Sequence, residues 1–226
     1  MSVAKTRSER ARLSAVRIYL IADASPRMQP IEAFVRAAVA GGVGMVQLRE
    51  KHMTDVELLD VARRYAAVCT ELGIPFILND RLDLALACGA DGVHLGQDDL
   101  PVPSSRAIAG EDFIIGLSTH TRGQIDIAAH LPADYIGVGP IHATPTKQGR
   151  PAVGTALVSY AAAHAGQPFF AIGGIEPENV AELIESGARG VSVLRWISNA
   201  PDPRSAAHAL AQAMERARPT AQSAGS

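Results

Sequence analysis

The segment FILNDRLDLALACGADGVHLGQDDL, residues 76–100, contains the pattern that decides the fold. It holds two short apolar runs, FIL and GVHL, with one compact helical pattern between them. A strand, a helix and a second strand in this order are typical of a unit whose two strands run parallel. Each run is followed by carboxylates: Asp80 closes the first, and Asp98 and Asp99 follow the second. Parallel strands would therefore place these acids at the same end of two neighbouring strands.

The same alternation continues along the chain. Helical patterns fill almost every gap between apolar runs, and they start with Thr, Asp or Pro, which are common helix-start residues. Eight such runs, with helices between them, predict an α/β fold in which a parallel sheet closes into a (β/α)8 or TIM barrel. The eight runs are RIYLIAD (17–23), MVQLRE (45–50), PFILND (75–80), GVHLG (92–96), FIIGLST (113–119), YIGVGPI (135–141), FFAIGG (169–174) and GVSVLR (190–195).

An internal repeat favours a closed barrel over an open sheet. Three segments share one plan, in which a helix-ending Gly is followed by a short turn and an apolar strand. An open doubly wound sheet is the alternative, but the glycine-rich turn usual near its start is missing from this sequence. We therefore expect one catalytic barrel domain over residues 16–218, between disordered tails at 1–15 and 219–226. The repeated segments are GGVGMVQLR (41–49), CGADGVHLG (88–96) and SGARGVSVL (186–194).

Composition excludes several classes of function. The chain has 226 residues, 47% of them hydrophobic, and a formal net charge of −2 without a basic stripe, so no nucleic-acid partner is expected. No apolar run approaches the ~18 residues of a membrane span, and the basic, polar start is not a signal peptide. These features predict a cytoplasmic protein without a membrane partner. Cys69 and Cys88 stand far apart and fit buried, reduced thiols. The sequence leaves a homo-oligomer open.

In a barrel of this kind, active groups lie on the loops that follow the strands. Asp80 and Asp99 offer hard oxygen ligands, and Mg²⁺ typically takes one or two protein carboxylates together with substrate phosphates and waters. Taken alone, Asp80 is better explained as the N-cap of the helix that follows it, but the second strand-end acid favours a metal site. Arg49, Lys51 and Lys147 add cations from two further strand ends. This set suits a magnesium-bound polyphosphate.

A second anionic site is indicated at the end of the seventh predicted strand. Gly173 and Gly174 precede the helical pattern EPENVAELIESG, so bare backbone amides would lie near a helix N-terminus. Together with the loop after the eighth strand, this is the usual phosphate position in such barrels. A lone Gly-Gly pair is equally common in simple turns.

At this point the residues resemble a known family, thiamine-phosphate synthase. The resemblance covers about residues 16–215, and its motifs occur in the family's order and spacing: QLREK, ILNDRLDLALACGADGVHLGQDDLP, GLSTHT, GVGPIHATPTK and FFAIGGI. It implies a transferase of thiamine biosynthesis that joins hydroxymethylpyrimidine diphosphate to a thiazole phosphate, giving thiamine phosphate and pyrophosphate. Some members use a carboxylated thiazole and lose CO₂. In the family, pyrophosphate leaves first and the thiazole nitrogen attacks the resulting pyrimidine-methyl cation.

The resemblance also implies roles for individual residues. Mg²⁺ would be held by Asp80 and Asp99. The predicted catalytic residues are Arg49, Lys51, Ser118 and Lys147. The pyrimidine diphosphate would be bound by Gln47, Leu48, Arg49, Glu50, Lys51, Asn79, Ser118 and Lys147. The thiazole phosphate would be bound by Thr144, Pro145, Thr146, Gly174 and the end of the eighth strand, Leu194 and Arg195.

The chain departs from the family at the end of the eighth predicted strand. The family usually carries a Val-Ser pair there, whereas this chain has Leu194 and Arg195. Arg195 either reaches the phosphate with its guanidinium, which is the favoured interpretation, or turns outward and leaves the contact to backbone amides. Two other functions stay open: a thiazole tautomerase on a similar barrel, and a non-catalytic sensor of phosphate ligands. The acids and cations needed for a diphosphate argue against both.

Overall fold

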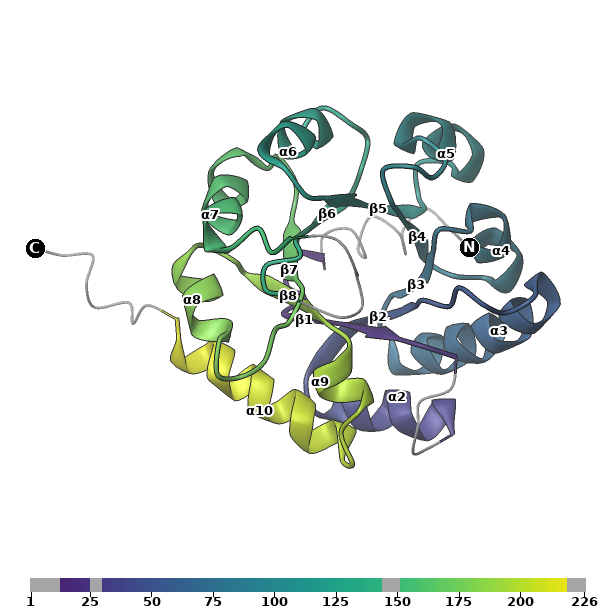
Figure 1. Ribbon diagram of the computed structural model, residues 1–226. Coiled ribbons are helices and arrows are strands. Elements are labelled where there is room, and N and C mark those ends of the chain that lie inside the picture. Colours follow the sequence, from purple (N-terminus) through teal and green to yellow (C-terminus); the bar gives the residue numbers. More distant parts are fainter. Residues whose placement is uncertain (1–12, 25–29, 144–150, 219–226) are drawn as a thin grey trace, which may run out of the picture.

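Eight parallel strands close into a barrel in sequence order, β1 next to β2 and finally β8 next to β1. The computed structural model describes residues 13–24, 30–143 and 151–218. Figure 1 shows the strands as a central ring with the helices around it. The open-sheet alternative is therefore wrong, and the predicted barrel is confirmed. The strands are β1 (Ile18–Ala22), β2 (Val43–Leu48), β3 (Phe76–Asn79), β4 (Gly92–Leu95), β5 (Ile114–Thr119), β6 (Tyr135–Val138), β7 (Phe169–Ile172) and β8 (Gly190–Val193).

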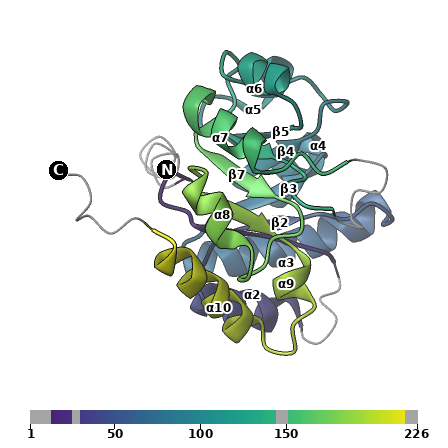
Figure 2. The same cartoon turned by 60° about the vertical axis from the view of Figure 1, so that its left-hand side comes forward.

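The helices lie outside the ring and cover the strands (Figure 2). The longest one begins at a capping box, in which Thr54 and Glu57 bond to each other's backbone amides, and it ends before Gly73 in the left-handed conformation. The helices of the described residues are α2 (Ile31–Ala40), α3 (Asp55–Leu72), α4 (Leu82–Cys88), α5 (Val102–Ala109), α6 (Arg122–Ala128), α7 (Thr155–His164), α8 (Val180–Glu185), α9 (Arg195–Ser198) and α10 (Pro203–Arg216).

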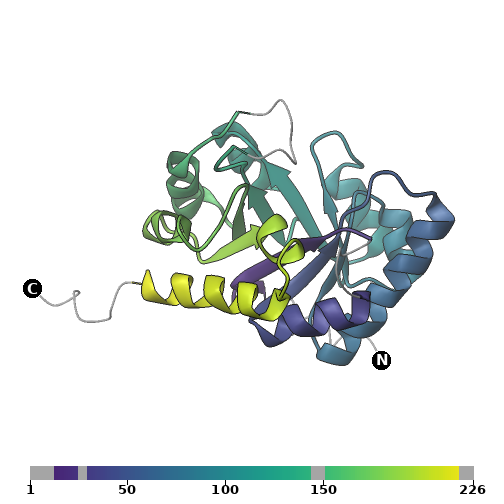
Figure 3. The same ribbon diagram turned by 60° about the horizontal axis from the view of Figure 1, so that its bottom comes forward.

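The last helix, α10, closes the outer layer by packing against α2. Figure 3 shows the two helices side by side along one flank of the barrel. The contact is close, because a side chain at Gly41, which follows α2, would collide with the Arg204 backbone. The end of the chain thus supports the beginning of the barrel, where β1 and β8 form the closing pair.

The apolar residues divide into two clusters. The larger one fills the layer between strands and helices and holds both cysteines, Cys69 and Cys88, as free thiols. The smaller one fills the inside of the barrel at the end where the strands begin. Because side chains alternate between the two sides of a strand, strands buried on both sides become continuous apolar runs. This explains why the strands were visible in the sequence.

The inner cluster corrects one predicted boundary. Leu13 is buried in it beside Val16, although the sequence assigned residues 1–15 to a tail. An apolar side chain at this position closes the base of the barrel, which stabilises the fold by removing it from water. The remaining parts of the two predicted tails, residues 1–12 and 219–226, lie outside the described residues.

No helix within residues 13–24, 30–143 and 151–218 combines the length and apolar character that crossing a membrane requires.

Candidate active site

A cavity of about 170 Å³, called the mouth cavity below, opens at the end of the barrel where the strands finish. It is bounded by the last residues of β1, β7 and β8 and by the segments that follow β2, β6, β7 and β8. Four predicted site residues meet there: Arg49, Gly174, Leu194 and Arg195. The residues that follow β2 and those that follow β8, almost 150 positions apart in the sequence, therefore share one cavity.

The two predicted metal ligands lie next to each other at the same end of the barrel. Asp80 directly follows β3, and its carboxyl interacts with that of Asp99 in the loop after β4. The pKa of Asp80 is raised to about 6, mainly by burial, then by the hydrogen bond with Asp99 and the charge of that residue, against the opposing charges of Lys51 and Arg49. The Lys51 Nζ lies 3.9 Å from an Asp80 oxygen.

Asp80 also has an unusual backbone. Its φ is +64°, and it is the one residue other than glycine with a positive φ in the described part of the chain. The backbone amide of Asp80 donates to the His94 carbonyl at 2.8 Å, so the strained conformation is held by the neighbouring strand. Asp99 is fixed in turn, because its carboxylate accepts the Gly96 amide at 2.6 Å. Strained residues of this kind gather at functional sites.

The interpretation of Asp80 as a helix cap is wrong. Arg81, not Asp80, occupies the N-cap position of α4, and no side chain caps that helix end. The Arg81 guanidinium instead forms ion pairs with Asp55 and Asp83 on the outside of the barrel. Asp80 is left free of any capping duty, which supports a functional role.

A chain of hydrogen bonds runs through the barrel interior and connects two predicted substrate residues. Gln47 donates to the Tyr19 hydroxyl at 2.5 Å, and Tyr19 shares a hydrogen bond of 2.8 Å with Tyr135. His94 then bonds the Tyr135 hydroxyl at 3.0 Å with Nδ1 and the Ser118 hydroxyl at 2.9 Å with Nε2. Gln47 and Ser118 are therefore oriented by the same internal network.

The tyrosines of this network were not found from the sequence. Both are completely buried, and burial is the main cause that raises the pKa of Tyr19 and of Tyr135 well above the usual range. Both hydroxyls are therefore neutral. A usable signal existed, since Tyr19 and Tyr135 stand in apolar strand runs, and a buried tyrosine hydroxyl requires a polar partner.

The other predicted substrate residues on or after β2 and β3 differ in their placement. Leu48 is fully buried in the outer apolar cluster, so its side chain points away from the barrel interior. Glu50 accepts the backbone amides of Lys51 and His52, which shapes the loop after β2. Asn79 is half-buried as the last residue of β3. A direct contact from Leu48 could come only from its backbone.

The glycines after β7 are arranged differently from the prediction. Gly173 and Gly174 have φ of 108° and 63°, and a side chain at Gly174 would crowd His142. The expected helix N-terminus does not follow directly, because α8 begins only at Val180. Asn179 creates the intervening turn by donating to the Gly174 carbonyl and accepting the Glu176 amide.

The eighth strand also ends earlier than predicted. It stops at Val193, and Arg195 is an exposed residue at the start of the short helix α9. Arg195 nevertheless lines the mouth cavity together with Gly174. The predicted residues Thr144, Pro145, Thr146 and Lys147 lie outside the described residues.

Paired acids, fixed cations and glycines around the strand ends of a (β/α)8 barrel define an enzyme of the barrel class. The particular family follows from comparison with known proteins. The chain belongs to the family described as thiamine monophosphate synthase, which matches residues 18–197.

Individual relatives agree with this family. A thiamine-phosphate synthase of Acidothermus cellulolyticus is 48% identical over 200 residues, which are 88% of this chain and 94% of the relative. A thiamine-phosphate synthase of Streptomyces avermitilis is 45% identical, over 92% of this chain and 98% of the relative. Other relatives are longer: the chain spans 56% of the one from Gloeobacter violaceus, at 47% identity over 86% of this chain.

Comparison with solved structures supports the same fold. The thiamine phosphate pyrophosphorylase of Pyrococcus furiosus is similar with a TM-score of 0.81 and 30% identity, over 91% of this chain and 98% of that one. A 3-hexulose-6-phosphate synthase is similar with a TM-score of 0.63 at 16% identity, over 87% of this chain and 99% of that one, which shows the barrel fold alone.

Proposed function

We propose that the chain is a thiamine-phosphate synthase, a transferase that joins hydroxymethylpyrimidine diphosphate to a thiazole phosphate and releases pyrophosphate. The observation that carries the proposal is the pair Asp80 and Asp99, beside Lys51, at the strand ends of a barrel of this family. In the reaction, the carbon–oxygen bond to the diphosphate breaks, and the pyrophosphate leaves with the electron pair. The thiazole nitrogen then forms a carbon–nitrogen bond with the methylene carbon.

The two acids fit a magnesium ion. Among the described residues, no group of three or more His, Cys, Asp or Glu could hold a metal by itself, which argues against an all-protein site. Mg²⁺ instead prefers one or two carboxylates and completes its shell with water and substrate phosphates. In this proposal Asp80 and Asp99 hold the ion. When bound, it supplies positive charge that stabilises the departing pyrophosphate.

The cations and the internal network have separate tasks in the proposal. Arg49 and Lys51 balance the charge of the diphosphate through charge-assisted hydrogen bonds, with Lys147 as a predicted third partner. Ser118 and Gln47 bind the pyrimidine, because the network through Tyr19, Tyr135 and His94 fixes their orientation. A step in which a leaving group departs needs stabilisation of negative charge more than a general base.

The thiazole phosphate is assigned to the mouth cavity of about 170 Å³. Gly174 and Arg195 both line this cavity: the glycine adds no side chain to it, and Arg195 contributes a cation. A guanidinium suits a phosphate because it can donate two parallel hydrogen bonds. The predicted contacts of Thr144, Pro145 and Thr146 belong to the same proposal.

A single assay tests the reaction and the metal. Purified protein would be mixed with the pyrimidine diphosphate and the thiazole phosphate, with Mg²⁺ or with EDTA, and thiamine phosphate followed by mass spectrometry. We expect product with Mg²⁺ alone. Failure with both the plain and the carboxylated thiazole, in folded protein, would overturn the proposal and favour the tautomerase or the sensor.

Substitution of the acids tests their role, and the same loop offers a control. Asp80→Asn and Asp99→Asn should each lower kcat/KM by about a hundredfold or more, because the developing charge loses its main support. Asp98→Asn is the matched control, since Asp98 is an exposed neighbour of Asp99. Near-normal turnover in either of the first two variants would contradict the assignment.

The location in the cell belongs to the same proposal. Cys69 and Cys88 are free and buried, which fits a reducing compartment such as the cytoplasm.

A further inference from the structure

A second cavity, called the basal cavity below, lies at the opposite end of the barrel from the predicted active site. It has a volume of about 930 Å³ and is bounded by the segments that precede β1, β7 and β8 and by α7, α8 and α10. Ligand sites commonly have 300–1,000 Å³, so this space can hold a small organic molecule. In barrels of this class the active site lies at the other end, and residues at this end usually serve stability. A cavity at this end therefore needs a separate explanation.

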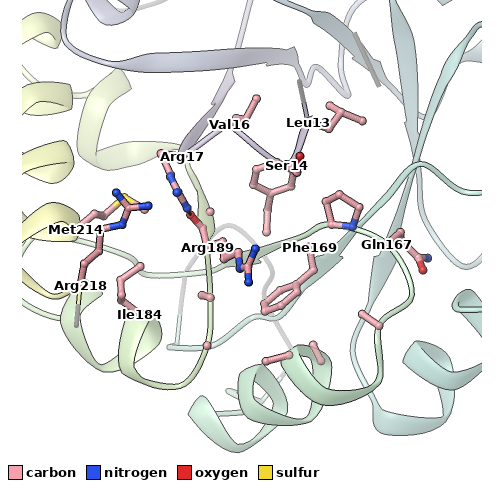
Figure 4. Close-up of a pocket in the computed structure, with 18 of the residues that line it drawn as sticks. Leu13, Ser14, Val16, Arg17, Gln167, Phe169, Ile184, Arg189, Met214 and Arg218 are labelled. Carbon is pink, nitrogen blue, oxygen red and sulfur yellow. Dashed lines mark hydrogen bonds between the residues drawn. The ribbon is translucent and has the colours of Figure 1, made fainter. Parts of the chain in front are cut away.

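Three arginines from three separate parts of the chain line this cavity. Arg17 precedes β1, Arg189 precedes β8, and Arg218 follows α10. Figure 4 shows Arg17 and Arg218 toward one side of the cavity, Arg189 nearer the middle beside Phe169, and Gln167 and Leu13 toward the other side. The Arg17 guanidinium donates to the Arg189 carbonyl at 2.8 Å, which fixes its position between the two strands that close the barrel.

The charges around the cavity are not balanced. Among the described residues that line it, Glu215 is the one acid, and this carboxylate pairs with Arg218 at 3.0 Å. Within the described residues, neither Arg17 nor Arg189 forms an ion pair with an acid. The pKa of Arg17 is lowered by partial burial and then by the charges of Arg218 and Arg189, against the opposing charge of Glu215. Such crowding is relieved by a bound anion.

The other walls of the cavity are apolar. Phe169, Ile184 and Met214 present large side chains, and α7 contributes small ones: Ala161, Ala162 and Ala165. Phe169 is half-buried and borders the same space as Arg189 (Figure 4). A ligand that satisfies both walls carries an anionic group at one end and a flat apolar ring at the other. Guanidinium groups favour phosphate or carboxylate at the anionic end.

We propose that this basal cavity binds a phosphate monoester of an aromatic compound, with its phosphate on Arg17, Arg189 and Arg218 and its ring on Phe169. The proposal does not depend on the reaction at the mouth.

The basal site is separate from the mouth. The inner aromatic side chains Tyr19, Tyr135 and Phe170 pack edge to face, with ring centres 5.3–5.7 Å apart, and fill the barrel between the two cavities. Phe170 is almost fully buried and lines the basal cavity from the barrel side. A ligand at the base therefore cannot contact the predicted active residues directly.

Calorimetric titration with phenyl phosphate tests the basal site. We expect Arg189→Gln and Arg218→Gln each to weaken binding at least about tenfold, because a charged hydrogen bond to the phosphate is lost. Arg216→Gln is the matched control, an exposed arginine of α10 outside the cavity, and should bind like the unchanged protein. Arg189 is exposed and its side chain has no ion pair among the described residues, so this variant should fold.

A second variant distinguishes binding at the basal cavity from binding at the mouth cavity, because the mouth cavity is also expected to bind phosphates. The triple variant Arg49→Ala, Lys51→Ala, Arg195→Ala removes the described cations of the mouth and should leave one binding event of unchanged affinity. Loss of all binding in that variant, or binding unaffected by Arg189→Gln, would overturn the proposal. Inorganic phosphate should bind at least about tenfold more weakly than phenyl phosphate, because it cannot cover the apolar wall. Equal affinity would contradict the assigned ligand class.

Discussion

The Tyr135 hydroxyl is the junction of the internal network. It meets the hydroxyl of Tyr19 at 2.8 Å and Nδ1 of His94 at 3.0 Å, and all three groups are buried. A buried polar group that loses its partner retains the full cost of leaving water. The network therefore contributes to stability and also holds Gln47 and Ser118 in place.

Removing this one hydroxyl should be measurable. Tyr135→Phe is expected to lower the free energy of unfolding by about 1–3 kcal/mol, because Tyr19 and His94 each lose a buried partner. Denaturant unfolding should show a lower midpoint at unchanged slope. Tyr160→Phe is the control, since that hydroxyl bonds Asp126 at the surface. Equal effects of both substitutions would contradict the importance of the buried junction.

Arg195 is the residue at which this chain departs from its family. It lines the mouth cavity from the start of α9. If it contacts the thiazole phosphate, Arg195→Ser should raise the KM for that substrate about tenfold with little change in kcat, because binding charge is lost before the chemical step. Arg204→Ser on α10 is the exposed control. An unchanged KM would reject the contact.

Residues at strand ends were more predictable than residues inside the barrel. Asp80 and Asp99 could be paired because parallel strands place their ends together, and their side chains do interact. The positive φ of Asp80 and the tyrosine network could not be predicted, since each depends on atoms from neighbouring strands that are distant in the sequence.

At the scale of elements, one buried ion pair connects α5 to the strands beside it. Arg106 on α5 pairs with Asp134 at 2.7 Å and donates to the Phe113 and Pro132 carbonyls. Asp134 also accepts the Ile115 amide at 2.7 Å. The pair therefore fixes the approach to both β5 and β6.

Breaking this pair should be costly. Arg106→Met is expected to destabilise the fold by about 3–5 kcal/mol, because Asp134 would stay buried without its counter-charge. Arg36→Met is the control: it breaks the exposed pair with Glu71 and should cost far less, because water screens that pair. Thermal or denaturant unfolding would compare them, and a small loss for Arg106→Met would show that the pair is dispensable.

The elements themselves were largely predictable, and their ends were not. Seven of the eight strands lie within the predicted apolar runs, because both of their faces are buried. The exception is β2, which begins at Val43, two residues before the predicted run 45–50. The end of β8 was wrong by two residues, since the chain turns into α9 where the apolar pattern still continues. The start of α8 was wrong because the Asn179 side chain supports a turn that no periodicity reveals.

At the scale of the whole molecule, the barrel closes around side chains that leave no spare room. Gly116 on β5 faces this interior, and a side chain there would collide with the rings of Tyr135 and His94. The glycine is therefore required by packing.

A pair of glycine substitutions tests this packing. Gly116→Ala should destabilise the protein by about 1–3 kcal/mol through overpacking. Gly123→Ala on α6, where the added methyl meets nothing within 4 Å, should be neutral or stabilise by up to about 1 kcal/mol. Denaturant midpoints would rank the two variants, and a neutral Gly116→Ala would contradict a tightly filled interior.

Closure of the barrel was predictable from the eight repeated units, whereas its base was not. The basal cavity is lined by Arg17, Arg189 and Arg218, which stand in unrelated sequence contexts. The first two meet because β1 and β8 are neighbours, and Arg218 joins them from the end of α10. Leu13 belongs to the same region. The sequence assigned it to a tail because its packing partners are also distant in the sequence.

The first and the last of the described residues, Leu13 and Arg218, both line that basal cavity. Catalysis is assigned to the mouth, at the opposite end of the barrel. A second domain attached next to either of these residues would therefore leave the substrate entrance uncovered. The longer relatives, of which this chain spans little more than half, have the length for such an arrangement. With both of these residues at the base, the barrel suits fusion to a second domain on the side away from its substrate entrance.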